Sequence, residues 1–288
     1  MKRNLHLLII DPQNDFCDLP AAYLPTDPLT GTARAPSLPV AGAHQDMLRL
    51  AGLIRHGQHG LTAISVTLDS HHRYDIAHPT FWQTGDGQPV APFTQILAAD
   101  IRAGRFVTRA AAALPRALAY AEALEAGGRY HLMVWPVHCE IGSWGHDVHA
   151  AVRAAYNGWE DARQAIVAKV GKGSNPWTEH YSAVVAEVPD PDDPATQVNQ
   201  AFLDSLAGAD TVYIGGEASS HCVKASTEHI AAAFGPAGVG KLVLIVDAMS
   251  PVAGFGAQHD AFLSDMAARG VRLATAAEVQ AELVANGA

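Results

Sequence analysis

The sequence predicts an α/β fold, a three-layer α/β/α sandwich with a mostly parallel central sheet. Short apolar runs alternate with longer segments of helical periodicity along most of the chain. This alternation is typical of a parallel sheet that is covered by helices on both faces. The short runs are also almost continuously apolar, as expected for strands that are buried on both faces.

Six segments have the pattern of strands and six have the pattern of helices. The expected strands are residues 6–10, 61–68, 130–135, 165–170, 211–215 and 242–247. The expected helices are residues 43–56, 111–126, 148–163, 195–207, 222–234 and 256–269. Stretches rich in breakers interrupt this plan at residues 19–39, 79–92 and 188–194. In the last of them, the Pro and Asp residues of VPDPDDP stop one element and cap the next helix.

We expect a single domain over residues 1–288, with insertions near 19–39 and 81–129, because the alternation of strand and helix resumes after each interruption. With 49% hydrophobic and 17% charged residues, the chain is too apolar to be disordered. The net charge of −10 argues against nucleic acid or an anionic membrane as a partner. No apolar run approaches the length of a membrane span, and the run at residues 5–10 is too short for a signal peptide.

Three cysteines in a long chain indicate free thiols and a reducing, cytoplasmic location. The sequence leaves the oligomeric state open, a homo-oligomer included.

Reactive side chains follow most of the expected strands, at the edge of an α/β sheet where ligands bind. Asp11 follows the first strand, where a carboxylate either acts in catalysis or caps a turn. Asp69 and His71 follow the second strand and alternate, so that their side chains point the same way and suit a metal ion. A polar strand end with surface histidines is the alternative. His78 lies on a loop that can return it to the site.

After the third strand, His138 stands beside Cys139 and follows Trp135. As a third ligand, His138 completes a set of two histidines and one carboxylate that leaves coordination positions open for water or substrate. Trp135 either offers a flat surface for an aromatic ligand or is part of the core. Lys169 and Lys172 lie near the end of the fourth strand. A lysine there either takes part in catalysis or is a solvated surface residue.

Cys222 follows Gly215 and Gly216 at the expected start of a helix. The positive end of the helix dipole stabilises a thiolate, which would lower the pKa of Cys222. The unpaired N–H groups of a helix start can also form an oxyanion hole. A buried structural cysteine is the alternative, but the preceding glycines and the tight turn favour a nucleophile.

Together these motifs resemble the nicotinamidase branch of the isochorismatase-like cysteine hydrolases. The resemblance runs from Leu5 to about Val252, and the motifs stand in the family's order. They are DPQNDF, DSH, WPVHC, KGSNPWTEHYSA, GEASSHCVKAS and DAMSPV. The chain is longer than most relatives, and its DSHHRYDIAHPTFW stretch differs from the shorter loop common there. These departures bear on the identity of the substrate more than on the type of reaction.

The resemblance implies a catalytic triad of Asp11, Lys172 and Cys222, and it selects Lys172 over Lys169. It implies an oxyanion hole from the N–H groups of Ala218 and Cys222, with a cis peptide bond between Glu217 and Ala218.

It also implies one divalent metal ion, with zinc favoured over iron or manganese, bound by Asp69, His71 and His138. Phe16, Trp135 and Tyr181 correspond to aromatic walls around the substrate. We place His78 with the substrate-binding residues rather than with the obligatory ligands.

The implied activity is hydrolysis of nicotinamide to nicotinate and ammonia through a cysteine thioester, in NAD salvage. One alternative is a related amidase that acts on another small amide. Another is a metal-free N-carbamoyl or ureido amidohydrolase, although these generally lack the two-histidine, one-aspartate set. A catalytically inactive binding protein is disfavoured by the complete triad, and isochorismatase activity proper by the nucleophilic cysteine.

Overall fold

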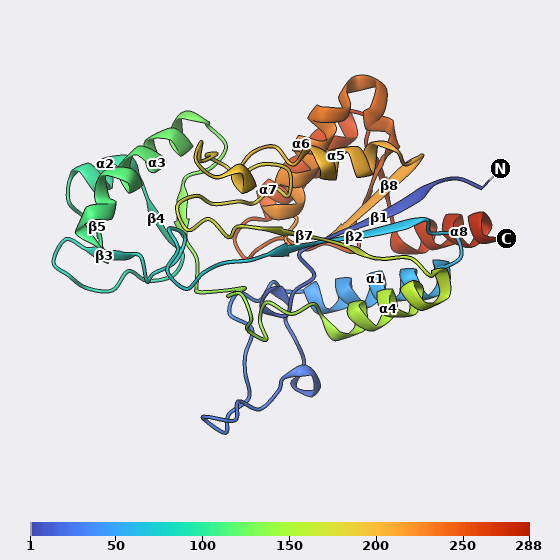
Figure 1. Ribbon diagram of the computed structural model, residues 1–288, viewed down its shortest axis with the longest axis horizontal. Coiled ribbons are helices and arrows are strands. Elements are labelled where there is room, and N and C mark those ends of the chain that lie inside the picture. The colour runs from blue at the N-terminus through green and yellow to red at the C-terminus, as the bar shows by residue number, and fades with distance from the viewer. Residues whose placement is uncertain (1) are drawn as a thin grey trace.

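The centre of the computed structural model, which describes residues 2–288, is a six-stranded sheet in the order β10-β9-β8-β1-β2-β7 (Figure 1). All neighbouring strands in it are parallel. Its strands are β1 (Leu5–Ile10), β2 (Ala63–Asp69), β7 (Ala168–Lys172), β8 (Thr211–Gly216), β9 (Leu242–Ile245) and β10 (Arg272–Ala274). The predicted sandwich with a parallel central sheet is confirmed.

Helices cover both faces of this sheet (Figure 1). On one face, α1 (Ala43–Gly57) packs against α4 (Ala150–Arg163) and α8 (Ala276–Gly287). On the other lie α5 (Gln200–Ala207), α6 (Cys222–Gly238) and α7 (Gly256–Ala268). Every residue of the central strands β1 and β8 is buried, so both faces of the sheet need a covering layer of helices.

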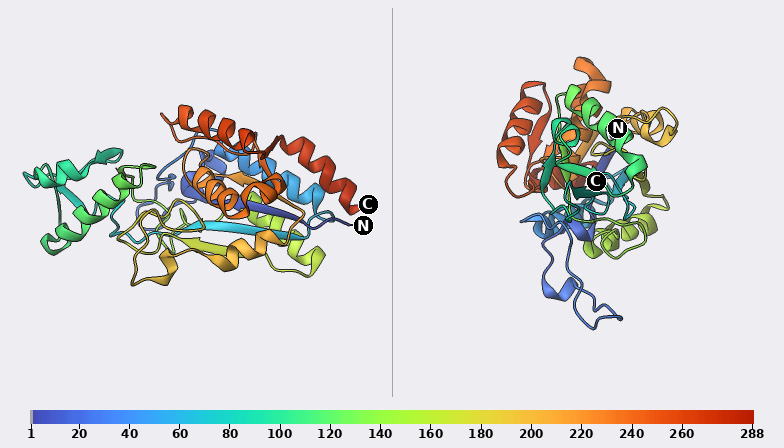
Figure 2. Two further views of the ribbon diagram at one scale, coloured as in Figure 1. Left: turned by 90° about the horizontal axis from the view of Figure 1, so that it is seen from above. Right: turned by 90° about the vertical axis from the view of Figure 1, so that its left-hand side faces the viewer.

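Residues 76–134 form a lobe that projects from the side of the sheet where its strands end (Figures 1 and 2). It contains β3 (Trp82–Thr84), β4 (Thr94–Ile96), α2 (Ala98–Arg102), β5 (Phe106–Thr108), α3 (Leu114–Ala126) and β6 (Leu132–Val134). β3 pairs with β5 and β4 with β6, both antiparallel. The lobe has a hydrophobic cluster of its own, which includes Phe81, Trp82, Ile96 and Leu124. The single-domain organisation stays a prediction.

The structure corrects two expectations about the sheet. The expected strand at residues 130–135 is not part of it, because Leu132–Val134 pairs with β4 in the lobe. The sixth strand is instead β10, which the sequence reading missed, as it missed α8 and most of the lobe. β10 has three residues and two of them are exposed, so its apolar pattern is too short and too weak to stand out.

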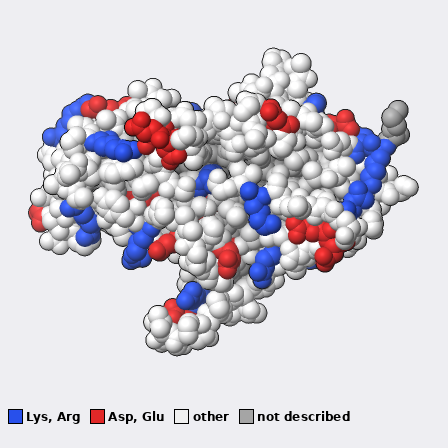
Figure 3. Space-filling model, in the orientation of Figure 1, with Lys and Arg blue, Asp and Glu red and all other residues white. Residues whose placement is uncertain are grey.

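A long loop at residues 19–39 projects on the side of α1 and α4 (Figures 1 and 2). Its regular structure is one 3₁₀ turn at Ala21–Tyr23 and a β-bridge between Thr26 and Ala33. Over the face drawn in Figure 3, acidic and basic side chains are interspersed rather than gathered by sign. Among the helices of residues 2–288, none combines the length and the apolar character needed to cross a membrane.

Candidate active site

Three buried side chains, two at strand ends and one at the start of a helix, meet at the carboxyl edge of the sheet. Lys172 Nζ lies 2.9 Å from Asp11 Oδ2 and donates a hydrogen bond of 3.5 Å to Cys222 Sγ. Asp11 directly follows β1, Lys172 ends β7 and Cys222 begins α6. The exposed fractions of the three residues are 0%, 3% and 6%, so these contacts are shielded from water.

The register of the sheet explains why these residues meet. Ile10 is paired with Gly216, and Asp69 is paired with Lys172 on the adjacent strands. A side chain at Gly216 would place its Cβ 2.0 Å from the carbonyl oxygen of Ile10, so β8 can approach β1 this closely only with glycine at that position. Lys169, the alternative lysine, is exposed and lies over the ring of Tyr156, with Nζ 4.9 Å from the ring centroid.

Thr67 holds Asp11 in place. Its hydroxyl donates a 2.5 Å hydrogen bond to Asp11 Oδ1 and accepts one of 2.9 Å from the Asp11 backbone N–H. Asp11 has a φ of +41°, an unfavourable backbone conformation for a residue with a side chain, which these contacts help to maintain. The sequence reading missed Thr67, although its place two residues before Asp69 in the strand puts both side chains on one face.

The electrostatics of this cluster correct the expectation of a low thiol pKa. Burial raises the pKa of the Cys222 thiol well above its usual value, and the nearby Lys172 ammonium offsets this only in part. Burial alone would lower the pKa of Lys172, but Asp11 and Asp69 raise it well above its usual value. Both shifts favour the protonated forms of Cys222 and Lys172, so that nucleophilic attack needs a base for the thiol proton.

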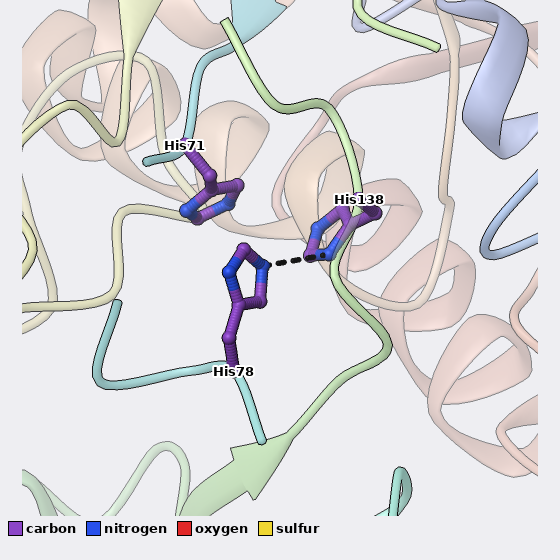
Figure 4. Close-up of side chains that lie close together, drawn as sticks. All are labelled: His71, His78 and His138. Carbon is purple, nitrogen blue, oxygen red and sulfur yellow. Dashed lines mark hydrogen bonds between the residues drawn. The ribbon is translucent and has the colours of Figure 1, made fainter. Parts of the chain in front are cut away.

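Beside this cluster, three buried histidines point toward one another (Figure 4). His71, His78 and His138 each present a ring nitrogen, and these nitrogens lie within 4.8 Å of one another. Asp69 Oδ2 lies 3.1 Å from His71 Nε2 and 3.3 Å from His138 Nε2. Three imidazoles and a carboxylate are ligands that suit zinc and related divalent ions.

Hydrogen bonds at the other ring nitrogens orient these histidines. His71 Nδ1 lies 3.0 Å from Asp75 Oδ2, His138 Nδ1 lies 2.8 Å from the Pro136 carbonyl and His78 Nδ1 lies 3.2 Å from the His72 carbonyl. A carbonyl or carboxylate partner makes Nδ1 a donor, and Nδ1 donors of this kind orient metal-bound histidines. The Nε2 atoms face the cluster itself: those of His71 and His138 face Asp69 Oδ2, and that of His78 lies 3.3 Å from His138 Nδ1 (Figure 4). Gly173 keeps space next to the cluster, since a Cβ there would lie 3.1 Å from Asp69 Oδ1. The residues present therefore fit a divalent ion.

His138 belongs to the cluster although the strand before it, β6, is not part of the central sheet. Its segment lies along the end of β2, where the His71 N–H bonds to the Cys139 carbonyl at 3.0 Å and the Ile141 N–H to the His71 carbonyl at 3.0 Å. Asp75 was missed in the sequence reading, although its position four residues after His71 in a histidine-rich loop is a usable signal.

A narrow pocket joins the cysteine to the histidine cluster. Phe16, Trp135 and Tyr181, which the sequence predicts as aromatic walls around the substrate, line this pocket. Trp135 Nε1 donates a 3.0 Å hydrogen bond to the Tyr181 hydroxyl, which fixes two of these walls to each other. The other lining residues are Leu38, Asp69, His138, Glu179, Ala218, His221, Cys222 and Val252. His78 does not line the pocket and lies behind His71 and His138, with ring centroids 5.0 and 5.2 Å away.

The loop before Cys222 has the features needed to bind an oxyanion. The peptide bond between Glu217 and Ala218 is cis, as the resemblance implies. Among residues 2–288, no hydrogen bond has the backbone N–H of Ala218 or of Cys222 as its donor. Both residues line the pocket, which makes their N–H groups candidates for binding an oxyanion there.

A wider surface groove lies elsewhere, beside Arg116, Trp177 and Asp190. It contains no residue of the predicted triad or of the histidine cluster, so the narrow pocket is the candidate site.

No protein-family model matches the sequence, and no curated protein matches it. Solved structures do share its fold. A nicotinamidase/pyrazinamidase from Acinetobacter baumanii aligns with a TM-score of 0.59 at 18% identity, over 96% of this chain and 98% of that one. A pyrazinamidase from Pyrococcus horikoshii in complex with zinc aligns with a TM-score of 0.51 at 16% identity, over 94% and 99%. An isochorismatase-like hydrolase from Alkaliphilus metalliredigens aligns with a TM-score of 0.50 at 15% identity, over 96% and 98%. The chain therefore has the isochorismatase-like α/β fold.

Proposed function

We propose that the protein is a metal-dependent cysteine amidohydrolase that hydrolyses small heteroaromatic amides, with nicotinamide as the first candidate substrate. The observation that carries this proposal is the position of Lys172, whose Nζ contacts both the Asp11 carboxylate and the Cys222 sulfur. The shared fold of nicotinamidases and pyrazinamidases supports the same chemistry. The free, buried state of all three cysteines supports a reducing, cytoplasmic location.

The first half of the reaction forms a thioester. Asp11 takes the thiol proton of Cys222, and Lys172 stabilises the negative charge that moves to sulfur. The sulfur attacks the amide carbon, and the carbonyl oxygen gains a negative charge that the N–H groups of Ala218 and Cys222 bind. Asp11 then gives its proton to the amide nitrogen, the C–N bond breaks and ammonia leaves.

The second half hydrolyses the thioester. Asp11 removes a proton from a water molecule that attacks the same carbon, the C–S bond breaks, and the sulfur regains its proton. A divalent ion held by Asp69, His71 and His138 would act as a Lewis acid that binds the ring nitrogen of the substrate or a water molecule.

Ammonia release by the metal-loaded protein tests this function directly. Nicotinamide, pyrazinamide and several non-aromatic amides should be compared as substrates, and we expect turnover of the two heteroaromatic amides. Hydrolysis restricted to N-carbamoyl or ureido compounds, by protein that binds no metal, would overturn the proposal in favour of the metal-free alternative. The buried histidine cluster argues against that alternative.

We also propose that His78 is a further ligand to the metal, because it belongs to the histidine cluster and does not line the pocket. We expect His71→Ala to abolish stoichiometric metal binding. His78→Ala should weaken metal affinity by at least about 10–100-fold, the loss that follows when only an outer partner of a metal ligand is removed. Metal content after dialysis against a chelator measures both effects.

His72→Ala is a suitable control for these variants, since His72 is exposed and contributes only its backbone carbonyl to the cluster. If His78→Ala keeps full metal affinity and instead raises the KM for nicotinamide, His78 is a substrate-binding residue, as the sequence suggested.

Thr67→Val tests how Asp11 is held. This change removes a hydroxyl that donates to a buried carboxylate, while it keeps the β-branched shape that a strand favours. Hydrogen bonds to charged groups contribute about 1.5–3 kcal/mol. We therefore expect kcat to fall about 10–100-fold.

Ser65→Ala is the matched control for Thr67→Val. Ser65 lies two residues earlier in β2 and is also buried, but its hydroxyl bonds to His6 Nε2 at 2.8 Å, outside the site. Equal losses of kcat in both variants would show that Thr67 acts only through the stability of the sheet.

A further inference from the structure

Glu179 is a buried carboxylate that lines the pocket and has no role in the proposed reaction. Its exposed fraction is 4%. Oε1 accepts a 3.0 Å hydrogen bond from the backbone N–H of His180. Within residues 2–288, no hydrogen bond engages Oε2 and no lysine or arginine forms an ion pair with the side chain. One oxygen of Glu179 is therefore left to the pocket.

Hydrogen bonds place Glu179 at the end of the pocket beside the histidine cluster. Its neighbour His180 accepts a 3.3 Å hydrogen bond from the Gly173 N–H at Nδ1, and a Cβ at Gly173 would lie 3.1 Å from Asp69 Oδ1. The reacting sulfur of Cys222 lies on the other side of Lys172, which bridges Asp69 and Cys222. A ring whose carboxamide carbon meets Cys222 thus extends toward the cluster and presents its opposite edge to Glu179.

The backbone of Glu179 is held from two sides. Its N–H donates a 3.1 Å hydrogen bond to the Tyr120 hydroxyl, and its carbonyl accepts one of 2.9 Å from the Glu187 N–H. Tyr120 belongs to α3 of the projecting lobe. The lobe therefore helps to fix the orientation of Glu179. A side chain that discriminates between substrates needs such a fixed orientation.

We propose that Glu179 determines the substrate specificity of this pocket, by selecting heteroaromatic amides with a hydrogen-bond donor on the ring edge opposite the carboxamide. The inference rests on the proposed amidohydrolase function and concerns the same site. A donor there pairs with Oε2 when the substrate displaces water, whereas a substrate without one leaves a buried acceptor unpaired, which is strongly unfavourable.

Two amides of nearly equal size test this selection in the wild-type, metal-loaded enzyme. 6-Aminonicotinamide carries an amino donor opposite the carboxamide, and 6-methylnicotinamide carries a methyl group at the same position. We expect kcat/KM for the amino compound to exceed that for the methyl compound by about tenfold or more. Equal values for the two amides would overturn the proposal without any variant.

Glu179→Gln sharpens the test. The glutamine oxygen must remain toward the His180 N–H, so its NH₂ group replaces the acceptor that faces the pocket. We expect the amino-to-methyl ratio to fall at least about tenfold, because two donors now face each other. An unchanged ratio in this variant would contradict the proposal.

Glu187→Gln is the matched control. Glu187 is a neighbouring buried glutamate that does not line the pocket and pairs with Arg129 at 3.4 Å, and its substitution should leave the ratio unchanged. Dissociation constants of both amides, measured in a Cys222→Ala background, provide a readout without turnover. If wild-type enzyme releases no ammonia from any pyridine amide, the proposed function fails, and the binding ratio still decides the role of Glu179.

Discussion

Cys222→Ala is expected to abolish amide hydrolysis, with a loss of at least about a thousandfold in kcat. The reaction requires a covalent bond between the substrate and the sulfur, and no other thiol in residues 2–288 contacts Lys172. Cys17 and Cys139 are buried on other segments. The variant should retain its fold and bound metal, because Cys222 is not one of the groups that converge on the histidine cluster. Ammonia release, metal content and thermal unfolding measure these three properties.

Cys17→Ser is the control for this variant. Cys17 Sγ donates a 3.3 Å hydrogen bond to the Gln13 carbonyl, a bond that a serine hydroxyl can also make. This change should leave kcat close to the wild-type value. Residual activity of Cys222→Ala within about tenfold of wild type, a difference of about 1.4 kcal/mol in the barrier, would refute a cysteine mechanism.

Lys172→Met is expected to be nearly as damaging, through two separate effects. Without the ammonium, the thiolate loses the only cation that contacts it among residues 2–288, and kcat should fall at least about a hundredfold. Asp11 and Asp69 would also remain buried without their cation, since Lys172 Nζ lies 2.9 Å from each. Breaking such a pair typically costs about 3–5 kcal/mol in the free energy of unfolding. Denaturant unfolding measures the second effect independently of activity.

Lys169→Met supplies the comparison on the same strand. Lys169 is exposed and its ammonium lies over the Tyr156 ring, so that its loss should change kcat by less than about threefold. If Lys169→Met proves the more damaging of the two, the assignment of the catalytic lysine is wrong.

The sequence by itself determined the class of fold and predicted most residues of the candidate site. Five of the six expected strands belong to the central sheet, because their apolar runs reflect burial on both faces. Asp11, Asp69 and Cys222 could be selected because each follows such a run, and the carboxyl ends of parallel strands share one edge. Between Lys169 and Lys172, the residues alone left the choice open. Only the family resemblance favoured Lys172, which the structure places in contact with Asp11 and Cys222.

Tertiary structure decided what depends on contacts between distant segments. His138 follows a strand that pairs within the lobe, yet backbone bonds to the end of β2 bring it to the site. Burial raises the pKa of Cys222, although its position at a helix start suggested the opposite, because desolvation depends on surrounding residues that a local pattern does not contain. Glu179 lies within the KGSNPWTEHYSA motif, but the sequence reading did not select it. Its contact with Tyr120, 59 positions earlier, exists only once the lobe has folded.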